Sequence, residues 1–303
     1  MAVSSSAIPE NPHHVRSMSM PSQSHPLALN LEEEIIKLKT WVSFSSSTSS
    51  LTAEMICNGL GHLKCLYDSV DDILQLPLSQ QALVYHQHQK WAEEVLDKSV
   101  RLLDICGTTR DILSQTKESV KDLRSALRRR GGDLCLESKV RSYICSRKKM
   151  TKDICKCIGA LKQMDKKHGS TSLLDQDPDL SIVGDVMSIT ISVLQAILSF
   201  MSTSAQKPKP RKWLLVSKLM HKGQVACEED DASDVNEVES ADTALFALSG
   251  QTRIKGIEIE KVNKALKRLE GMEISIDGVE AQLECMFRCM IQTRVSLLNI
   301  ITH

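Results

Sequence analysis

Few side chains in this 303-residue sequence have the types and spacing that a catalytic or metal site requires. A glycine-rich phosphate loop, a GxSxG nucleophile motif and an HExxH zinc motif are all absent from it. His86 and His88 are two residues apart, and a helix would place them on nearly opposite sides, so they cannot chelate one metal together. Asp68, Asp71 and Asp72 cluster on a predicted helix, where a solvated face is favoured over a metal site. The sequence therefore predicts a protein that is not an enzyme and holds no cofactor.

The 10 cysteines also lack the spacing of a metal site, because none of them forms a CxxC pair. The closest spacings are Cys155-x-Cys157 and Cys285-x3-Cys289, and the second pair shares a helix face without a matching pair of histidines. Scattered cysteines in a chain without a secretory signal predict reduced, buried thiols and a cytoplasmic, reducing environment.

The first 25 residues contain a candidate modification site. They are rich in Ser, Pro and His with almost no apolar pattern, which predicts a disordered tail. Within this tail, Arg16, Ser17, Ser19 and Pro21 resemble a kinase site. Phosphate on Ser19 would give these residues the form of a motif that adaptors of the 14-3-3 type bind through clustered arginines. The alternatives are an inert tail and, because the tail is rich in Ser and poor in acids, a plastid transit peptide.

Two basic clusters form a candidate contact surface. One lies in the predicted helix 134–168 and the other in the linker 203–212, and their members are Arg147, Lys148, Lys149, Lys152, Lys207, Lys209, Arg211 and Lys212. A solvated face is the favoured interpretation, and contact with an anionic membrane surface or an acidic partner is the alternative. An acidic loop, 223–242, follows the linker and is expected to be disordered. With 38 basic and 38 acidic residues the net charge is zero, so no overall field favours nucleic acid.

The elements that position these residues are predicted by helical periodicity. In the stretch 79–132, apolar or small residues recur at alternating steps of three and four, as in a helix seam, from Trp91 through Leu113 to Leu127. Ser79 is the expected N-cap of this helix, and the three arginines before Gly131 suit its C-terminal end. An unbroken helix here would be roughly 75 Å long, with Gly107 as a candidate kink.

Further helices flank this central one. The pattern predicts helices over 27–41, over 134–168 and over 261–301, and another that Thr52 caps and Pro77 stops. The Ser/Thr run 43–50 is expected to be a loop. The C-terminal helix is long enough to lie antiparallel along the central one, with Gly271 and Gly278 as weak points.

A helix that begins at Asp177-Pro178 contains the most apolar stretch, and residues 186–202 carry no charge. This length is near the lower limit for a membrane span. Ser188, Ser192 and Gln195 interrupt the stretch, so we expect a helix buried at the centre of a bundle rather than a membrane helix.

The predicted fold is all-α: an elongated, mostly antiparallel bundle of long helices with a disordered N-terminal tail and an acidic loop. Hydrophobic residues make up 42% of the chain and aromatic residues only 3%, so the core must consist of aliphatic side chains, as helix seams usually do. The expected organisation is the tail 1–25 followed by one bundle domain over 26–303, which contains the acidic loop.

Five segments also resemble one plant-specific family, the domain of unknown function 241 family that is grouped with the BYPASS proteins. They are HVRSMSMPSQSHPL, DDILQLPLSQQAL, WAEEVLDKSVRLLDICGTTRDIL, YICSRKKM and IQTRVSLLNI, and the resemblance extends from about His14 to Ile301. It implies a plant protein linked to root and shoot development and to restraint of a mobile root-derived signal, and it supplies no catalytic residues. We therefore expect a non-enzymatic developmental regulator or interaction scaffold in the cytoplasm. The alternatives are a peripheral membrane or trafficking adaptor and, for the location, the plastid.

Overall fold

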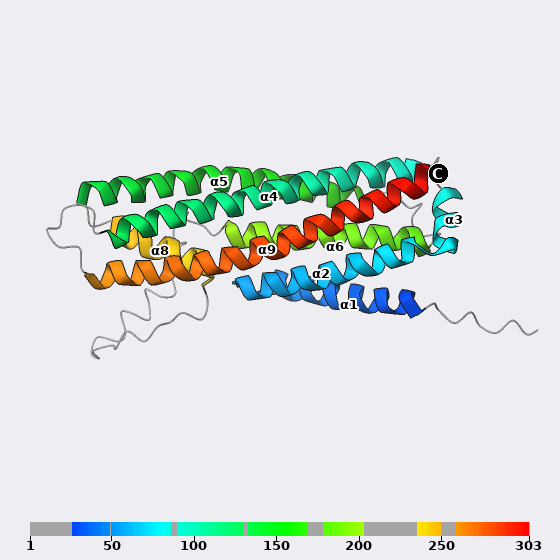
Figure 1. Cartoon of the computed structure of the whole chain (residues 1–303), viewed down its shortest axis with the longest axis horizontal. Helices are drawn as coiled ribbons and strands as arrows, with labels where there is room; N and C mark the ends of the chain where they lie inside the picture. Colours follow the sequence, from blue (N-terminus) through cyan, green and yellow to red (C-terminus); the bar gives the residue numbers. More distant parts are fainter. Residues whose placement is uncertain are drawn as a thin grey trace, which may run out of the picture.

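The computed structural model of this chain describes residues 26–48, 50–85, 90–129, 133–168, 178–202, 235–249 and 259–302. Every regular element in these ranges is a helix, so the all-α prediction is confirmed (Figure 1). The helices are α1 Pro26–Ser47, α2 Ala53–Leu74, α3 Pro77–Tyr85, α4 Lys90–Arg128, α5 Asp133–His168, α6 Pro178–Met201, α8 Glu237–Ser249 and α9 Ile259–Thr302.

The long helices lie side by side in an elongated bundle (Figure 1). Helix α9 runs antiparallel to α4, as predicted. Arg110 pairs with Glu284, whereas Arg124, later in α4, pairs with Glu270, which is earlier in α9. Helices α2 and α9 run parallel. The Asp68 carboxylate is in contact with the Cys289 thiol, and the Asp71 carboxylate, later in α2, accepts a hydrogen bond from Ser296, later in α9. The bundle is therefore mostly, but not wholly, antiparallel.

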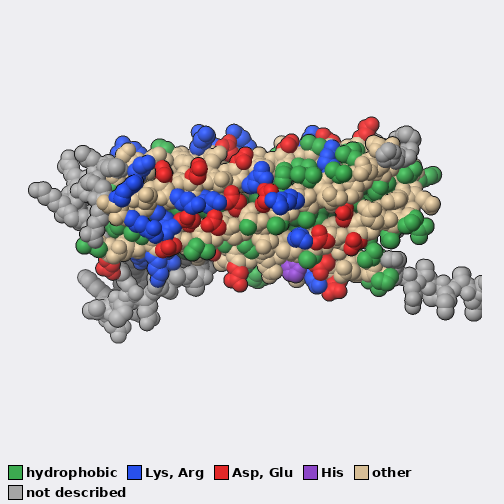
Figure 2. Space-filling view, in the orientation of Figure 1, with side chains coloured by type: hydrophobic (Ala, Val, Ile, Leu, Met, Phe, Trp, Pro, Cys, Tyr) green, Lys and Arg blue, Asp and Glu red, His purple; other side chains and the backbone are tan. Residues whose placement is uncertain are grey.

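Opposite charges line the contact between α4 and α9, and we call these pairs the α4–α9 charge ladder. Lysines and arginines of α4 meet carboxylates of α9 over three helical turns and more: Arg110 with Glu284 at 2.6 Å, Lys117 with Asp277 at 3.1 Å and with Glu280, and Arg124 with Glu270 at 2.9 Å and with Glu273. Figure 2 shows blue and red side chains alternating along this face. The ladder pairs successive turns of α4 with successive turns of α9.

Helix α6 occupies the centre of the bundle and packs against α1, α2, α4 and α5. Val193, Ile197, Leu198 and Met201 have no exposed surface, and Phe200 has 1%. The segment Ile182–Met201 is long and apolar enough to cross a membrane by length and composition, and 67% of it is buried inside the bundle. The expected burial of this stretch among the other helices is confirmed.

The predicted helix over 79–132 is wrong at its N-terminal end. Helix α3 starts at Pro77, which suits the first position of a helix because it lacks an N–H, so Ser79 lies inside α3 and does not cap α4. Figure 1 shows α3 lying across the end of the bundle, while α4 starts at Lys90 and runs along it. The 39 residues of α4 measure about 58 Å, and the helix passes through Gly107 without a break.

The predicted loop 43–50 is also wrong over its first half, because α1 continues to Ser47. The hydroxyls of Ser43, Ser46 and Ser47 donate to carbonyls three or four residues earlier, at 2.8–2.9 Å, which satisfies them within the helix. Thr52 caps α2 as predicted, accepting from the N–H of Met55 at 3.3 Å. Helix α9 continues through Gly271 and Gly278.

The acidic loop predicted for 223–242 is wrong over 237–242, which form the first turns of α8. The side-chain oxygen of Asn236 accepts from the N–H of Glu239 at 2.8 Å, as an N-cap does. Glu237 and Glu239 then lie in the first turn, where their negative charges suit the helix dipole. Residues 223–234 lie outside the described residues.

Candidate functional site

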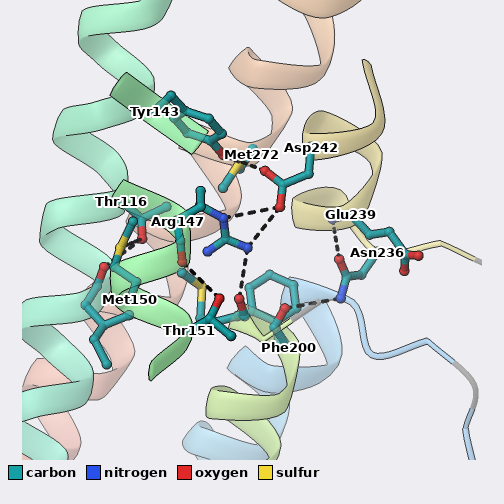
Figure 3. A network of polar contacts seen from close by, with 12 residues as sticks. Thr116, Tyr143, Arg147, Met150, Thr151, Phe200, Asn236, Glu239, Asp242 and Met272 are labelled. Atoms are coloured by element: carbon teal, nitrogen blue, oxygen red, sulfur yellow. Dashed lines mark hydrogen bonds and ion pairs between the residues drawn. The ribbon is translucent and has the colours of Figure 1, made fainter. Parts of the chain in front are cut away.

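The most connected polar site in the described bundle is a buried network around Arg147, on α5 (Figure 3). Arg147 is 5% exposed, and its Nε and Nη2 donate to Oδ2 of Asp242 on α8, at 3.2 and 3.0 Å. Nη2 also donates to the carbonyl of Met201 at 3.0 Å. The Tyr143 hydroxyl donates to Oδ1 of Asp242 at 2.8 Å, so both carboxylate oxygens are bound. The network joins α5, α8 and the C-terminal end of α6.

The start of α8 adds two more contacts to this junction. The Asn236 amide donates to the carbonyl of Phe200 at 3.3 Å. The Glu237 carboxylate accepts from the N–H of Ala53, the first residue of α2, at 3.2 and 3.3 Å. Because Phe200 and Asn236 are in contact, the chain leaves α6 and returns to α8 at neighbouring positions.

Burial decides the protonation of the network. Removal from water raises the pKa of the Tyr143 phenol well above its usual value, and the charge of Asp242 raises it further. The phenol therefore stays protonated and keeps donating its hydrogen bond. Tyr143, Arg147 and Asp242 are 4%, 5% and 5% exposed, and their contacts join three helices.

Arg147 was predicted to lie on a basic surface, and the structure shows that this is wrong. The inward face of α5 presents Tyr143, Arg147, Met150 and Ile154, all buried, at steps of four, three and four. Arg147 therefore falls on the apolar stripe of its own helix. This helical spacing was visible in the sequence, but the prediction of a basic surface considered only the run of charged residues.

The lysines that follow Arg147 do face solvent. Lys148, Lys149 and Lys152 are exposed on α5, and none of them pairs with a carboxylate of the described residues, whereas Lys156 pairs with Asp153 at 2.9 Å. No large apolar side chain is exposed over residues 136–166 of this helix. We call Lys148, Lys149 and Lys152 the α5 lysine face.

The remaining predicted site residues lie outside the described residues. They are Arg16, Ser17, Ser19 and Pro21 of the tail motif and Lys207, Lys209, Arg211 and Lys212 of the linker. The structure therefore neither joins them to the α5 lysine face nor separates them from it.

The cysteines were predicted to be reduced, buried thiols. The eight described cysteines are free thiols, but Cys65, Cys145, Cys155 and Cys285 are exposed, so the prediction that the thiols are buried is wrong for them. Burial raises the pKa of Cys106 to about 12. Within the described ranges, no three His, Cys, Asp or Glu residues are grouped as ligands for a metal ion.

The predicted carboxylate cluster divides between two partners. Asp68 pairs with Lys64 at 2.6 Å, and Asp71 accepts from the Ser296 hydroxyl at 2.8 Å. These carboxylates contribute to the helix surface and to the contact between α2 and α9.

Comparison with known proteins adds one positive finding. A family model described as Protein BPS1 matches residues 59–300, from the middle of α2 almost to the end of α9. No curated protein and no solved structure matches the chain.

Proposed function

From the premise that this chain belongs to the BPS1 family, we propose that it is a non-enzymatic interaction scaffold that regulates plant development from the cytoplasm. The family resemblance supports root and shoot development as the setting. The matched region covers most of the bundle, so the scaffold in this proposal is the helical body itself. Its core is filled by aliphatic side chains, which leaves the outer faces of the long helices as the places for partners.

The α5 lysine face is the observation that carries this proposal. Exposed lysines usually reduce their mutual repulsion by pairing with carboxylates at neighbouring turns, as Arg141 does with Glu137 at 2.8 Å. Lys148, Lys149 and Lys152 lie close together on α5, and none of them forms such an ion pair with the described residues. An acidic segment of a partner protein would supply the missing negative charge and associate quickly through it.

An interaction screen in plant tissue tests the proposal directly. The full chain and the variant Lys148→Ala/Lys152→Ala serve as baits, beside the control Lys264→Ala/Lys267→Ala. The control removes two exposed lysines from α9, so both variants lose the same charge. We expect acidic partners that the parent and the control capture and the α5 variant does not. Equal capture by all three baits would refute a role for the α5 lysine face.

A peripheral membrane or trafficking adaptor is the second candidate, because lysine clusters are attracted to anionic lipid at about 1 kcal/mol for each residue near the surface. The exposed face of α5 offers no large apolar side chain to enter the lipid, which favours the protein partner. Flotation with anionic liposomes separates the two. The scaffold proposal expects the protein to stay at the bottom of the gradient at physiological salt, and flotation that the α5 variant loses would favour the adaptor.

A further inference from the structure

A groove of about 370 Å³ lies where the C-terminal end of α1 meets α6 and the start of α8. Its polar rim includes Ser45, Ser46, Ser192 and Glu239, and its apolar wall includes Ala196 and Phe200. The volume is that of a small-molecule site. The Arg147 network and the Asn236 cap hold α8 against α6, so two walls of the groove are fixed by buried contacts.

Three hydroxyls that line the groove already donate their protons within their own helices. The hydroxyls of Ser45 and Ser46 both donate to the carbonyl of Val42, at 2.9 and 2.8 Å. Ser192 donates to the carbonyl of Ser188 at 3.1 Å. A hydroxyl that donates its proton keeps two lone pairs, so these three oxygens can still accept hydrogen bonds.

Among the described residues, the one charged side chain that lines the groove is that of Glu239, which lies in the first turn of α8. Glu239 brings a carboxylate, and among the described lining residues there is no lysine or arginine. Within the described ranges no cationic side chain pairs with Glu239, whereas its neighbour Glu237 is bound to the N–H of Ala53. Figure 3 shows the Glu239 carboxylate directed away from the Arg147 network. The end of α1 at Ser47 adds the negative pole of a helix.

We propose that this groove binds a small aliphatic polyamine. Ammonium groups carry only donors, which match the acceptor oxygens of the rim, and their positive charge meets Glu239. The methylene chain between them would lie on the apolar wall that Val42, Ala196 and Phe200 contribute. Such a ligand site is separate from the α5 lysine face, so each stands or falls alone.

Titration calorimetry of the full-length protein with spermidine tests the proposal. Glu239→Gln removes the carboxylate charge and keeps the shape, and we expect it to weaken binding about tenfold or more. Glu54→Gln removes the same charge from an exposed site in the first turn of α2 and should leave the affinity unchanged. Ser199→Trp, at the exposed rim of the groove, should block binding without loss of charge. Circular dichroism confirms that each variant is folded.

Two further ligands define what the groove accepts. A neutral aliphatic diol of the same length should not bind, because it lacks the charge. A capped trilysine peptide carries the charge of spermidine on a peptide backbone and should bind more weakly. Equal spermidine affinity in the parent, Glu239→Gln and Glu54→Gln would overturn the site. Tighter binding of the peptide than of spermidine would assign the groove to a basic protein segment and overturn the assignment to a free polyamine.

Discussion

Arg147 and Lys148 are neighbours in the sequence with the same charge, yet one is buried and the other is exposed. The difference comes from the direction in which each side chain leaves α5. Arg147 points inward, where Asp242 and the carbonyl of Met201 bind its Nε and Nη2, while its buried Nη1 has no hydrogen-bond partner among the described residues. Asp242 lies 95 positions away and was predicted to be part of an acidic loop, so no local pattern connected the two residues.

Removal of one partner of this pair should destabilise the bundle strongly. Arg147→Ala leaves the Asp242 carboxylate buried without its cation, and we expect a loss of about 3–5 kcal/mol in the free energy of unfolding. The double variant Arg147→Met/Asp242→Leu removes both charges and should lose less than the single variant. Urea denaturation measures both values. A double variant that is less stable than Arg147→Ala would show that the pair itself, rather than the avoidance of an unpaired charge, stabilises the fold.

Ser19 remains a prediction from the sequence, since the tail lies outside the described residues. Arg16 lies three residues upstream of Ser19, where basophilic kinases commonly require a positive charge. Phosphate would add a charge of about −1.5 to −2, and an adaptor of the 14-3-3 type would bind it through clustered arginines. We expect a phosphorylated peptide of residues 12–26 to capture such an adaptor, and the unphosphorylated peptide to fail. Equal recovery with both peptides, or with neither, would remove the idea.

At the scale of the helices, an apolar seam does not by itself determine register. The seam of α4 repeats about every seven residues, so α9 would bury nearly the same side chains after a shift of one heptad. The α4–α9 charge ladder favours the observed register, because Arg110, Lys117 and Arg124 all meet carboxylates in it, whereas a shift of one heptad would leave one of the three without a carboxylate opposite. Arg124 and Glu273 are 13% and 15% exposed, so salt screens them less than a surface pair.

A charge swap tests the ladder. Glu273→Arg places two cations against each other and should lower the melting temperature, and Arg124→Glu in the same chain should restore part of the loss. The difference between the single and the double variant should shrink in 1 M salt, where the screening length is about 3 Å. Thermal melts at low and high salt give all four values. A double variant no more stable than Glu273→Arg would indicate that this pair contributes nothing to register.

The helices themselves were largely predictable, because their seams repeat over many turns. The bounds expected for 134–168 and 261–301 differ from those of α5 and α9 by at most two residues. The errors lie where local composition misled. The serines at the end of α1 indicated a loop, although their hydroxyls bond within the helix. The acidic residues at the start of α8 indicated disorder. In the structure Asn236 caps this helix, and Asp242 pairs with Arg147. Long-range partners decided both the helix α8 and the buried arginine.

At the scale of the whole molecule, α6 is the element that the other helices enclose. It has the length and apolar content of a membrane span, and four other helices cover most of it. Its uncovered side carries Ser188, Ser192, Gln195 and Ser199, at steps of four, three and four. A helix in lipid would place these polar side chains in hydrocarbon, whereas in the bundle they face the surface and the α1–α6–α8 groove.

The last prediction follows from this placement of α6. Extraction of plant membranes with alkaline carbonate releases proteins held by surface charge and retains proteins that span the bilayer. We expect the full chain to appear in the supernatant, because α6 is already covered by α1, α2, α4 and α5. A fusion that carries an added apolar helix should stay in the pellet and serves as the control for retention. Retention of the unmodified chain would mean that α6 leaves the bundle to enter lipid, and the buried contacts of Val193, Leu198 and Phe200 would then describe a different state of the molecule.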